Sequence, residues 1–139
     1  MSAKLLLVED NADDEALALR ALHKHLPPDS IVVVRDGVAA LDYLLDDTRP
    51  LPRIVLLDLK LPRLDGLEVL RHLRADPRTQ YMPVVVMTSS DEGRDIRQSY
   101  ALGANSYVQK PVNYERFMQA VAHISQYWLE LNRITHVTP

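Results

Sequence analysis

Four consecutive aliphatic residues, Ile54 to Leu57, run directly into a single carboxylate at Asp58. The run is short, begins with two β-branched residues and closely follows Pro52. These features predict a strand that is buried on both faces, as in a parallel sheet covered by helices. Asp58 would then lie at the carboxyl end of that strand, where open α/β sheets place their ligands. Because an unpaired buried carboxylate is costly, Asp58 either caps the next loop or meets a cation.

Apolar runs and amphipathic stretches alternate five times along the chain. The expected strands are residues 4–8, 31–34, 54–57, 83–87 and 106–109. The expected helices are residues 12–25, 37–45, 65–76, 89–103 and 113–131. Right-handed crossovers between such units predict an α/β fold, a parallel sheet with helices on both faces. The strand lengths and connections suit the flavodoxin-like, three-layer (βα)5 type with five strands in the order 2-1-3-4-5. The 139 residues suit one domain, with a core over about 4–132 and a short tail.

Polar residues mark the expected helix starts. Asn11 is a good N-cap for the first helix. Asp65 with Glu68, and Ser89 with Glu92, have the spacing of capping boxes for the third and fourth helices.

The charge balance and the lack of cysteine limit the classes of function. A formal net charge of −3 argues against broad electrostatic binding of DNA or of a membrane surface. Without cysteine there is no disulfide and no thiolate metal site, which fits a reducing compartment. The sequence shows no signal-peptide pattern and no apolar run long enough to span a bilayer. We therefore expect a cytoplasmic protein.

Polar groups follow four of the five expected strands: Glu9 and Asp10 the first, Asp58 the third, Thr88 the fourth and Lys110 the fifth. The carboxyl ends of parallel strands share one sheet edge, so the three carboxylates would repel one another unless a cation neutralises them. Oxygen ligands alone favour a hard ion such as Mg²⁺. A lysine and a hydroxyl at the same edge suit a phosphoryl group, for which Asp58 would be the nucleophile.

In this order, the motifs resemble those of a response-regulator receiver domain, the CheY-like phospho-acceptor of two-component signalling. The resemblance covers nearly the whole chain. It is carried by Val8-Glu9-Asp10, Leu57-Asp58-Leu59-Lys60-Leu61-Pro62 with Asp65-Gly66, Met87-Thr88-Ser89, Gly103-Ala104 and Tyr107-Val108-Gln109-Lys110-Pro111. Stretches at 9–11, 88–90, 103–107 and 128–132 are also similar to stand-alone regulators paired with bacterial phytochrome histidine kinases.

The resemblance implies a role for each matched residue in a phosphorelay. Asp58 would accept a phosphoryl group from a sensor histidine kinase and become 4-aspartylphosphate. Asp10, Asp58 and the backbone carbonyl of Lys60 would bind Mg²⁺ directly, and Glu9 would help through water. Lys110 would pair with a phosphoryl oxygen. Such a protein is not an enzyme in the ordinary sense, although it promotes its own phosphotransfer and self-dephosphorylation.

The resemblance also implies a switch. Thr88 would move to hydrogen-bond the phosphoryl group, and Tyr107 would follow by turning inward. The face made by the fourth helix, the fifth strand and the fifth helix would then be altered for partners. In this family the bond between Lys110 and Pro111 is typically cis.

Two positions depart from the common family pattern. Glu9 stands where an aspartate is often found, and Lys60 occupies a variable position two residues after Asp58. The Lys60 ammonium either leans over the phosphoryl group and changes the rate of dephosphorylation, or it is solvated. We expect no output domain after the last helix, and we expect residues 135–139 to form a frayed tail.

Two other functions compete with this one. An Asp-nucleophile phosphatase would carry a second acid in a D-x-D pattern, but Lys60 stands at that position. A phosphorylation-independent, receiver-like binding module would not need the intact site residues. Taken singly, Thr88 could be a cap, Lys110 a surface charge and Tyr107 a core residue, so the functional interpretation rests on their joint placement.

The last expected helix carries two apolar stripes. The first stripe consists of Phe117, Val121, Ile124 and Trp128. The second consists of Ala120, Tyr127, Leu131 and Ile134. One stripe is needed for the core, so the second is either a wide core contact or an interface. Our interface candidates for a homodimer are Tyr127, Trp128, Leu131 and Ile134.

Overall fold

The computed structural model describes residues 3–135 and contains five strands and five α-helices in strict alternation. The strands are β1 (Leu5–Val8), β2 (Ile31–Val34), β3 (Ile54–Leu57), β4 (Val84–Thr88) and β5 (Ser106–Gln109). The helices are α1 (Ala12–Leu22), α2 (Gly37–Leu44), α3 (Gly66–Ala75), α4 (Gly93–Ala101) and α5 (Tyr114–Gln126), with a short 3₁₀ turn η1 (Pro28–Ser30) and a π turn η2 (Tyr127–Leu131). Within the described part of the chain, no helix is long and apolar enough to cross a membrane.

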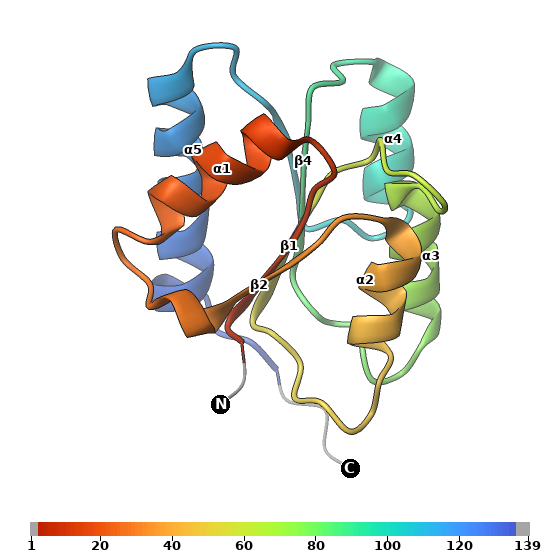
Figure 1. Cartoon of the computed structure of the whole chain (residues 1–139). Coiled ribbons are helices and arrows are strands. Elements are labelled where there is room, and N and C mark those ends of the chain that lie inside the picture. Colours follow the sequence, from red (N-terminus) through yellow and green to blue (C-terminus); the bar gives the residue numbers. More distant parts are fainter. Residues whose placement is uncertain (1–2, 136–139) are drawn as a thin grey trace.

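All strands pair in parallel in the order β2-β1-β3-β4-β5, which confirms the predicted fold and topology. β3 lies in the middle, and all four of its residues are buried, as a strand covered on both faces requires. Figure 1 shows α1 and α5 on one face of the sheet and α2, α3 and α4 on the other. The carboxyl ends of β1, β3, β4 and β5 therefore meet at one edge.

Alternate residues of the central strands enter two separate cores. Leu56 of β3 packs with α1 and α5 through Leu22 and Phe117, whereas Leu57 packs with α3 through Leu70. The first stripe of the last helix belongs to the α1–α5 core: Phe117 and Val121 are buried, and Ile124 and Trp128 pack against it. The assignment of that stripe to the core is confirmed.

Four of the five α-helices begin with a side-chain cap. The capping residues Asn11, Asp36, Asp65 and Asn113 each accept a hydrogen bond from the backbone N–H three residues later. The capping box from Ser89 to Glu92 is wrong. Glu92 precedes α4 without a side-chain cap, and Ser89 is exposed.

The first helix also ends earlier than predicted, at Leu22 rather than near His25. The N–H groups of Lys24 and His25 donate to the carbonyl oxygens of Ala21 and Leu22, three residues back. These tighter turns close the helix before the predicted end.

Gly66 allows α3 to begin directly against the loop that follows Asp58. A Cβ atom at this position would lie 2.4 Å from the Asp58 carbonyl oxygen and 2.7 Å from the Leu59 Cα. The Gly66 N–H instead donates to the Leu59 carbonyl at 2.9 Å. Because backbone atoms cannot yield as a flexible side chain does, only glycine permits this close approach, which holds the Asp58 loop in place.

The end of the last helix departs from the predicted second stripe. In η2 the Asn132 N–H donates to the Tyr127 carbonyl at 2.7 Å, five residues back, and the chain is extended at Asn132. Tyr127 and Leu131 are exposed, but Ile134 lies beyond the helix end and lines a pocket near Pro83. Placing Ile134 on one helical face with Tyr127 and Leu131 was therefore wrong, because the helix ends at Leu131 and the chain turns extended before it reaches Ile134. Most of the predicted tail, residues 136–139, lies outside the described residues.

Candidate phosphoryl-acceptor site

Backbone hydrogen bonds bring the predicted site residues to one edge of the sheet. The Asp58 N–H donates to the carbonyl oxygen of Val8, the last residue of β1, at 3.1 Å. The Lys110 N–H donates to the carbonyl oxygen of Thr88, the last residue of β4, at 2.7 Å. The ends of β1, β3, β4 and β5 are thus placed together by the sheet itself.

The Lys110 ammonium lies at the centre of a buried cluster of carboxylates. Its Nζ is 2.7 Å from Glu9 Oε1, 2.7 Å from Asp58 Oδ2 and 2.8 Å from Asp14 Oδ2. The side chains of Lys110, Glu9 and Asp58 are all less than one-tenth exposed. Lysine is rarely buried without a partner, so this cluster accounts for the position of Lys110.

Asp14 was missed as a member of this cluster. In the sequence, Asn11 indicated only where α1 begins. A helix that begins just after Asn11 carries Asp14 in its first turn, directly beyond the end of β1. The position of Asp14 in that first turn could have indicated that it lies near the acceptor edge. Its contact with Lys110, however, joins residues 96 positions apart and depends on the tertiary structure.

The pKa values of Glu9 and Lys110 are both raised, which favours the neutral form of Glu9 and the charged form of Lys110. Burial raises the pKa of Glu9 from 4.5 to about 7, although the hydrogen bond from Lys110 opposes the shift. Burial alone would disfavour the Lys110 ammonium, but its hydrogen bonds to Asp14, Asp58 and Glu9 outweigh burial and raise the pKa of Lys110. Lys110 is therefore charged at neutral pH, while Glu9 changes protonation near it.

The carboxylates of Glu9, Asp10 and Asp58 fit a divalent cation. One oxygen from each lies within 4.8 Å of the others. Lys110 pairs with Glu9, Asp14 and Asp58, and the exposed Asp10 adds a fourth carboxylate beside them, so negative charge remains in excess. An oxygen-only donor set without histidine or cysteine is the kind that Mg²⁺ or Mn²⁺ occupies.

The Lys110–Pro111 peptide bond differs from the family expectation. No cis peptide bond occurs between residues 3 and 135, so this bond is trans.

The Thr88 hydroxyl is a buried polar group without a partner among the described residues. The residue is fully buried, and Oγ1 makes no hydrogen bond there. Leaving such a group unpaired costs about 1–3 kcal/mol, so an unsatisfied hydroxyl at this edge calls for a ligand atom or water.

Tyr107 connects β5 to the loop after β4. Its ring packs against the core on the α3 side, and its hydroxyl donates to the Ser90 carbonyl at 2.8 Å. Burial raises the pKa of Tyr107, so the phenol remains a protonated donor. The structure thus holds Tyr107 by the same loop that follows Thr88.

The Lys60 side chain turns toward α4. Its Nζ lies 3.8 Å from Oδ2 of Asp95, a buried carboxylate that also accepts a hydrogen bond from Ser90 Oγ at 2.6 Å. The Lys60 side chain is 67% exposed. Of the two predicted positions, the ammonium is therefore largely solvated, with a loose contact to Asp95. The Lys60 backbone N–H donates to Asp58 Oδ1 at 3.2 Å.

Comparison with known proteins decides between the competing families. Residues 5–122 match the family model described as the response regulator receiver domain. The chain belongs to this family. Receiver domains are the phospho-acceptors of two-component phosphorelays, so the resemblance found in the sequence is confirmed.

Three relatives cover nearly all of the receiver chain. The probable methanogenesis regulatory protein FilR2 of Methanothrix harundinacea is 44% identical over 132 residues, which cover 93% of this chain and 85% of the relative. The structure of the phosphorylated cyanobacterial phytochrome response regulator RcpA has a TM-score of 0.90 at 38% identity, covering 96% of this chain and 99% of that one. The Mn²⁺-bound form of response regulator Rcp1, a Synechocystis protein, has a TM-score of 0.86 at 36% identity, covering 94% and 97%.

Proposed function

We propose that Asp58 accepts a phosphoryl group from the phosphohistidine of a sensor histidine kinase. A carboxylate oxygen of Asp58 attacks phosphorus, the P–N bond breaks, and the imidazole nitrogen keeps the bonding electron pair. The product is an aspartyl phosphate, which water later hydrolyses to aspartate and inorganic phosphate. The observation that carries this proposal is a buried Asp58 bonded to Lys110 at the sheet edge that also holds the unpaired Thr88 hydroxyl.

Asp10, Asp58 and the backbone carbonyl of Lys60 would hold Mg²⁺ directly, and Glu9 through water. When bound, the ion neutralises charge on the phosphoryl oxygens. The excess of carboxylates at this edge and the Mn²⁺-bound relative support this assignment.

Lys110 and Thr88 supply the remaining contacts to the phosphoryl group. Lys110 already donates to Asp58 and can shift to a phosphoryl oxygen with little movement. The Thr88 hydroxyl, which has no partner among the described residues, would donate a hydrogen bond to another oxygen of the same phosphoryl group. Tyr107, held through Ser90 to the loop after β4, would then change with that loop. Phosphoryl binding thereby shifts the population toward a state with an altered α4–β5–α5 face, which partners read.

Intact mass after incubation with acetyl phosphate and Mg²⁺ tests this function. We expect one added phosphoryl group that is lost in hydroxylamine, because hydroxylamine cleaves acyl phosphates. A protein that takes no phosphoryl group would favour the phosphorylation-independent binding module instead.

Metal binding should depend on pH through Glu9. Because burial raises the pKa of Glu9 to about 7, its side chain is protonated below that pH and cannot support a cation. The apparent affinity for Mg²⁺ should therefore rise as pH increases through 7, with proton release on binding. Titration calorimetry in two buffers of different ionisation enthalpy measures both effects. In Glu9→Gln the rise through pH 7 should disappear, and a persistent rise would contradict the assignment to Glu9.

The proposed phospho-acceptor role and the similarity to phytochrome response regulators both support a histidine kinase as the partner. A receiver needs a histidine kinase as donor, and the likeness to a phytochrome response regulator supports a bacterial phytochrome kinase. The same role places the protein in the cytoplasm with the kinase transmitter. A net charge of −3 does not support binding to DNA or to a membrane surface.

We also infer a homodimer through the end of the last helix. Tyr127 and Leu131 are 48% and 72% exposed, and Trp128 packs edge-to-face on Tyr127 at 5.0 Å between ring centroids. Ile134 no longer belongs to this surface. Solution mass with and without beryllofluoride and Mg²⁺ should show a dimer that Leu131→Asp weakens. A monomer under both conditions would overturn the proposal.

A further inference from the structure

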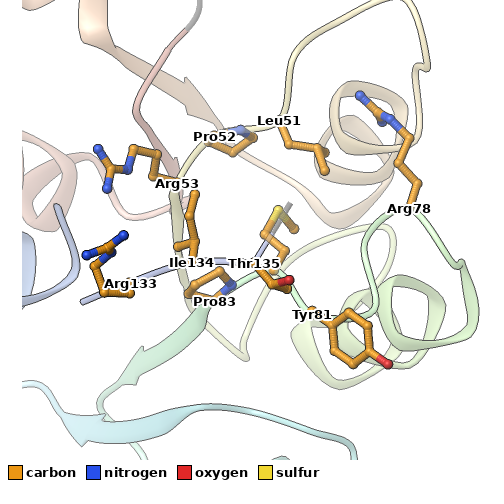
Figure 2. A pocket seen from close by; sticks show the side chains of 10 residues that line it. Leu51, Pro52, Arg53, Arg78, Tyr81, Pro83, Arg133, Ile134 and Thr135 are labelled. Atoms are coloured by element: carbon orange, nitrogen blue, oxygen red, sulfur yellow. The ribbon is translucent and has the colours of Figure 1, made fainter. Parts of the chain in front are cut away.

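A cavity of about 620 Å³ lies at the edge of the sheet opposite Asp58 (Figure 2). Arg53 and Pro83, which line it, immediately precede β3 and β4, and Ile134 closes it from the segment after η2. Arg53 and Asp58 bracket the four residues of β3, which places them about 16 Å apart at 3.3 Å per residue. The cavity is therefore separate from the phosphoryl-acceptor site.

Three arginines line this cavity: Arg53, Arg78 and Arg133. The ten described residues that form its lining include no acidic side chain. Figure 2 shows the guanidinium groups of Arg53 and Arg133 on the same side of the cavity, with Arg78 on the other. In a chain with net charge −3, this is a local concentration of positive charge. We call it the basic pocket.

The charge in the basic pocket is not compensated within the described residues. Arg78 donates to the carbonyl oxygens of Leu44 and Arg49, which are neutral acceptors. Neither Arg53 nor Arg133 takes part in an ion pair there. The Arg53 Nε is buried and has no hydrogen-bond partner among those residues. A buried donor without an acceptor is rare in folded proteins, and a bound anion would satisfy it.

The rest of the lining is mostly apolar, with Thr135 and the Tyr81 hydroxyl as its other polar groups. Pro52, Pro83 and Ile134 form part of the wall, and the Tyr81 ring is 65% exposed at the rim. A volume of this size is typical of small-molecule sites, in which a few polar groups orient a largely apolar ligand. The guanidinium fork matches the oxygens of carboxylates and phosphates.

We propose that the basic pocket binds a small organic anion, with a carboxylate or phosphate group on Arg53 and Arg133 and an apolar body against Ile134 and Tyr81. This site is independent of phosphorylation at Asp58. Because Arg133 and Ile134 follow the last helix closely, the ligand would also contact the extended segment 133–135 after η2.

Backbone amide NMR with simple probes tests the proposal. Phenylphosphonate represents the phosphate class and cannot phosphorylate Asp58, because its phosphorus is bonded to carbon. Benzoate represents the carboxylate class, and benzyl alcohol is the neutral control. Saturable shifts at residues 51–53, 81–83 and 133–135 are expected with at least one anion, and whichever anion binds more tightly identifies the class.

Variants separate charge recognition from non-specific binding. Arg53→Gln and Arg133→Gln should each weaken anion binding about tenfold, which corresponds to 1.4 kcal/mol. Arg97→Gln, at an exposed position on α4, should bind as the wild type does. Because Arg133 is exposed, Arg133→Gln should keep the wild-type spectrum even if Arg53→Gln unfolds.

The proposal would be overturned by an absence of saturable shifts with either anion, by equal binding of benzyl alcohol, or by unchanged binding in Arg133→Gln. Binding that persists in Asp58→Asn with EDTA present supports a separate site. Loss of binding in that variant would assign the anion to the phosphoryl-acceptor site and overturn the proposal.

Discussion

Replacing Asp58 by asparagine should abolish phosphoryl transfer from acetyl phosphate. The amide cannot act as the nucleophile, and Glu9, the buried carboxylate beside Asp58 at this edge, is already hydrogen-bonded to Lys110 and to the Asn11 N–H. We expect no phosphoryl addition by intact mass under conditions in which the wild type is labelled. The folded state should survive, because removing one of several clustered carboxylates lowers their mutual repulsion.

Asp13→Asn is the matched control for Asp58→Asn. Asp13 lies in the first turn of α1, near the same edge of the sheet, but it is exposed and does not contact Lys110 in the structure. This variant should be labelled like the wild type. Continued labelling of Asp58→Asn would place the acceptor elsewhere and overturn the proposed function.

Lys110→Met should strongly destabilise the metal-free protein. The substitution keeps much of the side-chain volume but removes the ammonium shared by Glu9, Asp14 and Asp58. Breaking a buried ion pair by removing one partner costs about 3–5 kcal/mol, because the remaining charges stay buried and unpaired. Urea unfolding measures this change. Lys24→Met, at an exposed position on the surface, should change stability little.

The loss in Lys110→Met should depend on pH and on Mg²⁺. The pKa of Glu9 is raised from 4.5 to about 7 in the folded protein. Protonation of Glu9 therefore stabilises the folded state at low pH, and this contribution disappears as pH rises through 7. The variant should lie closest to the wild type at low pH and furthest from it above pH 7, where Mg²⁺ should restore part of the loss. Equal stability of the two proteins above pH 7 without metal would contradict the role of Lys110 in the cluster.

Much of the sheet and its functional edge could be predicted from local patterns. Short aliphatic runs such as Ile54–Leu57 predicted strands because a doubly covered strand needs apolar residues on both faces. Right-handed crossovers between alternating units predict a parallel sheet covered on both faces, and the strand lengths and connections suited the order that the structure shows. Once the strands are parallel, residues such as Asp58 and Lys110 must meet at the edge where the strands end.

Local patterns were less successful at helix ends. The Ser89–Glu92 spacing matched a capping box, but Ser90 instead accepts from the Glu92 N–H and bonds to Asp95. The Ser90 hydroxyl has these two partners because α4 begins only at Gly93, three residues later. Ser89 is exposed and does not cap the helix. A spacing rule cannot distinguish neighbouring serines whose environments differ only in the folded chain.

The sequence by itself determined the fold and placed Glu9, Asp58, Thr88 and Lys110 at one edge, because both depend on local periodicity and on the geometry of parallel strands. The family followed from the resemblance of its motifs to those of receiver domains. Only the tertiary structure decided that Asp14 joins Lys110, that Lys60 faces Asp95, and that Ile134 leaves the last helix for the basic pocket. These contacts join segments far apart in the chain or follow from where the last helix ends. Their free energies depend on the packing of the surrounding side chains, which no local pattern encodes.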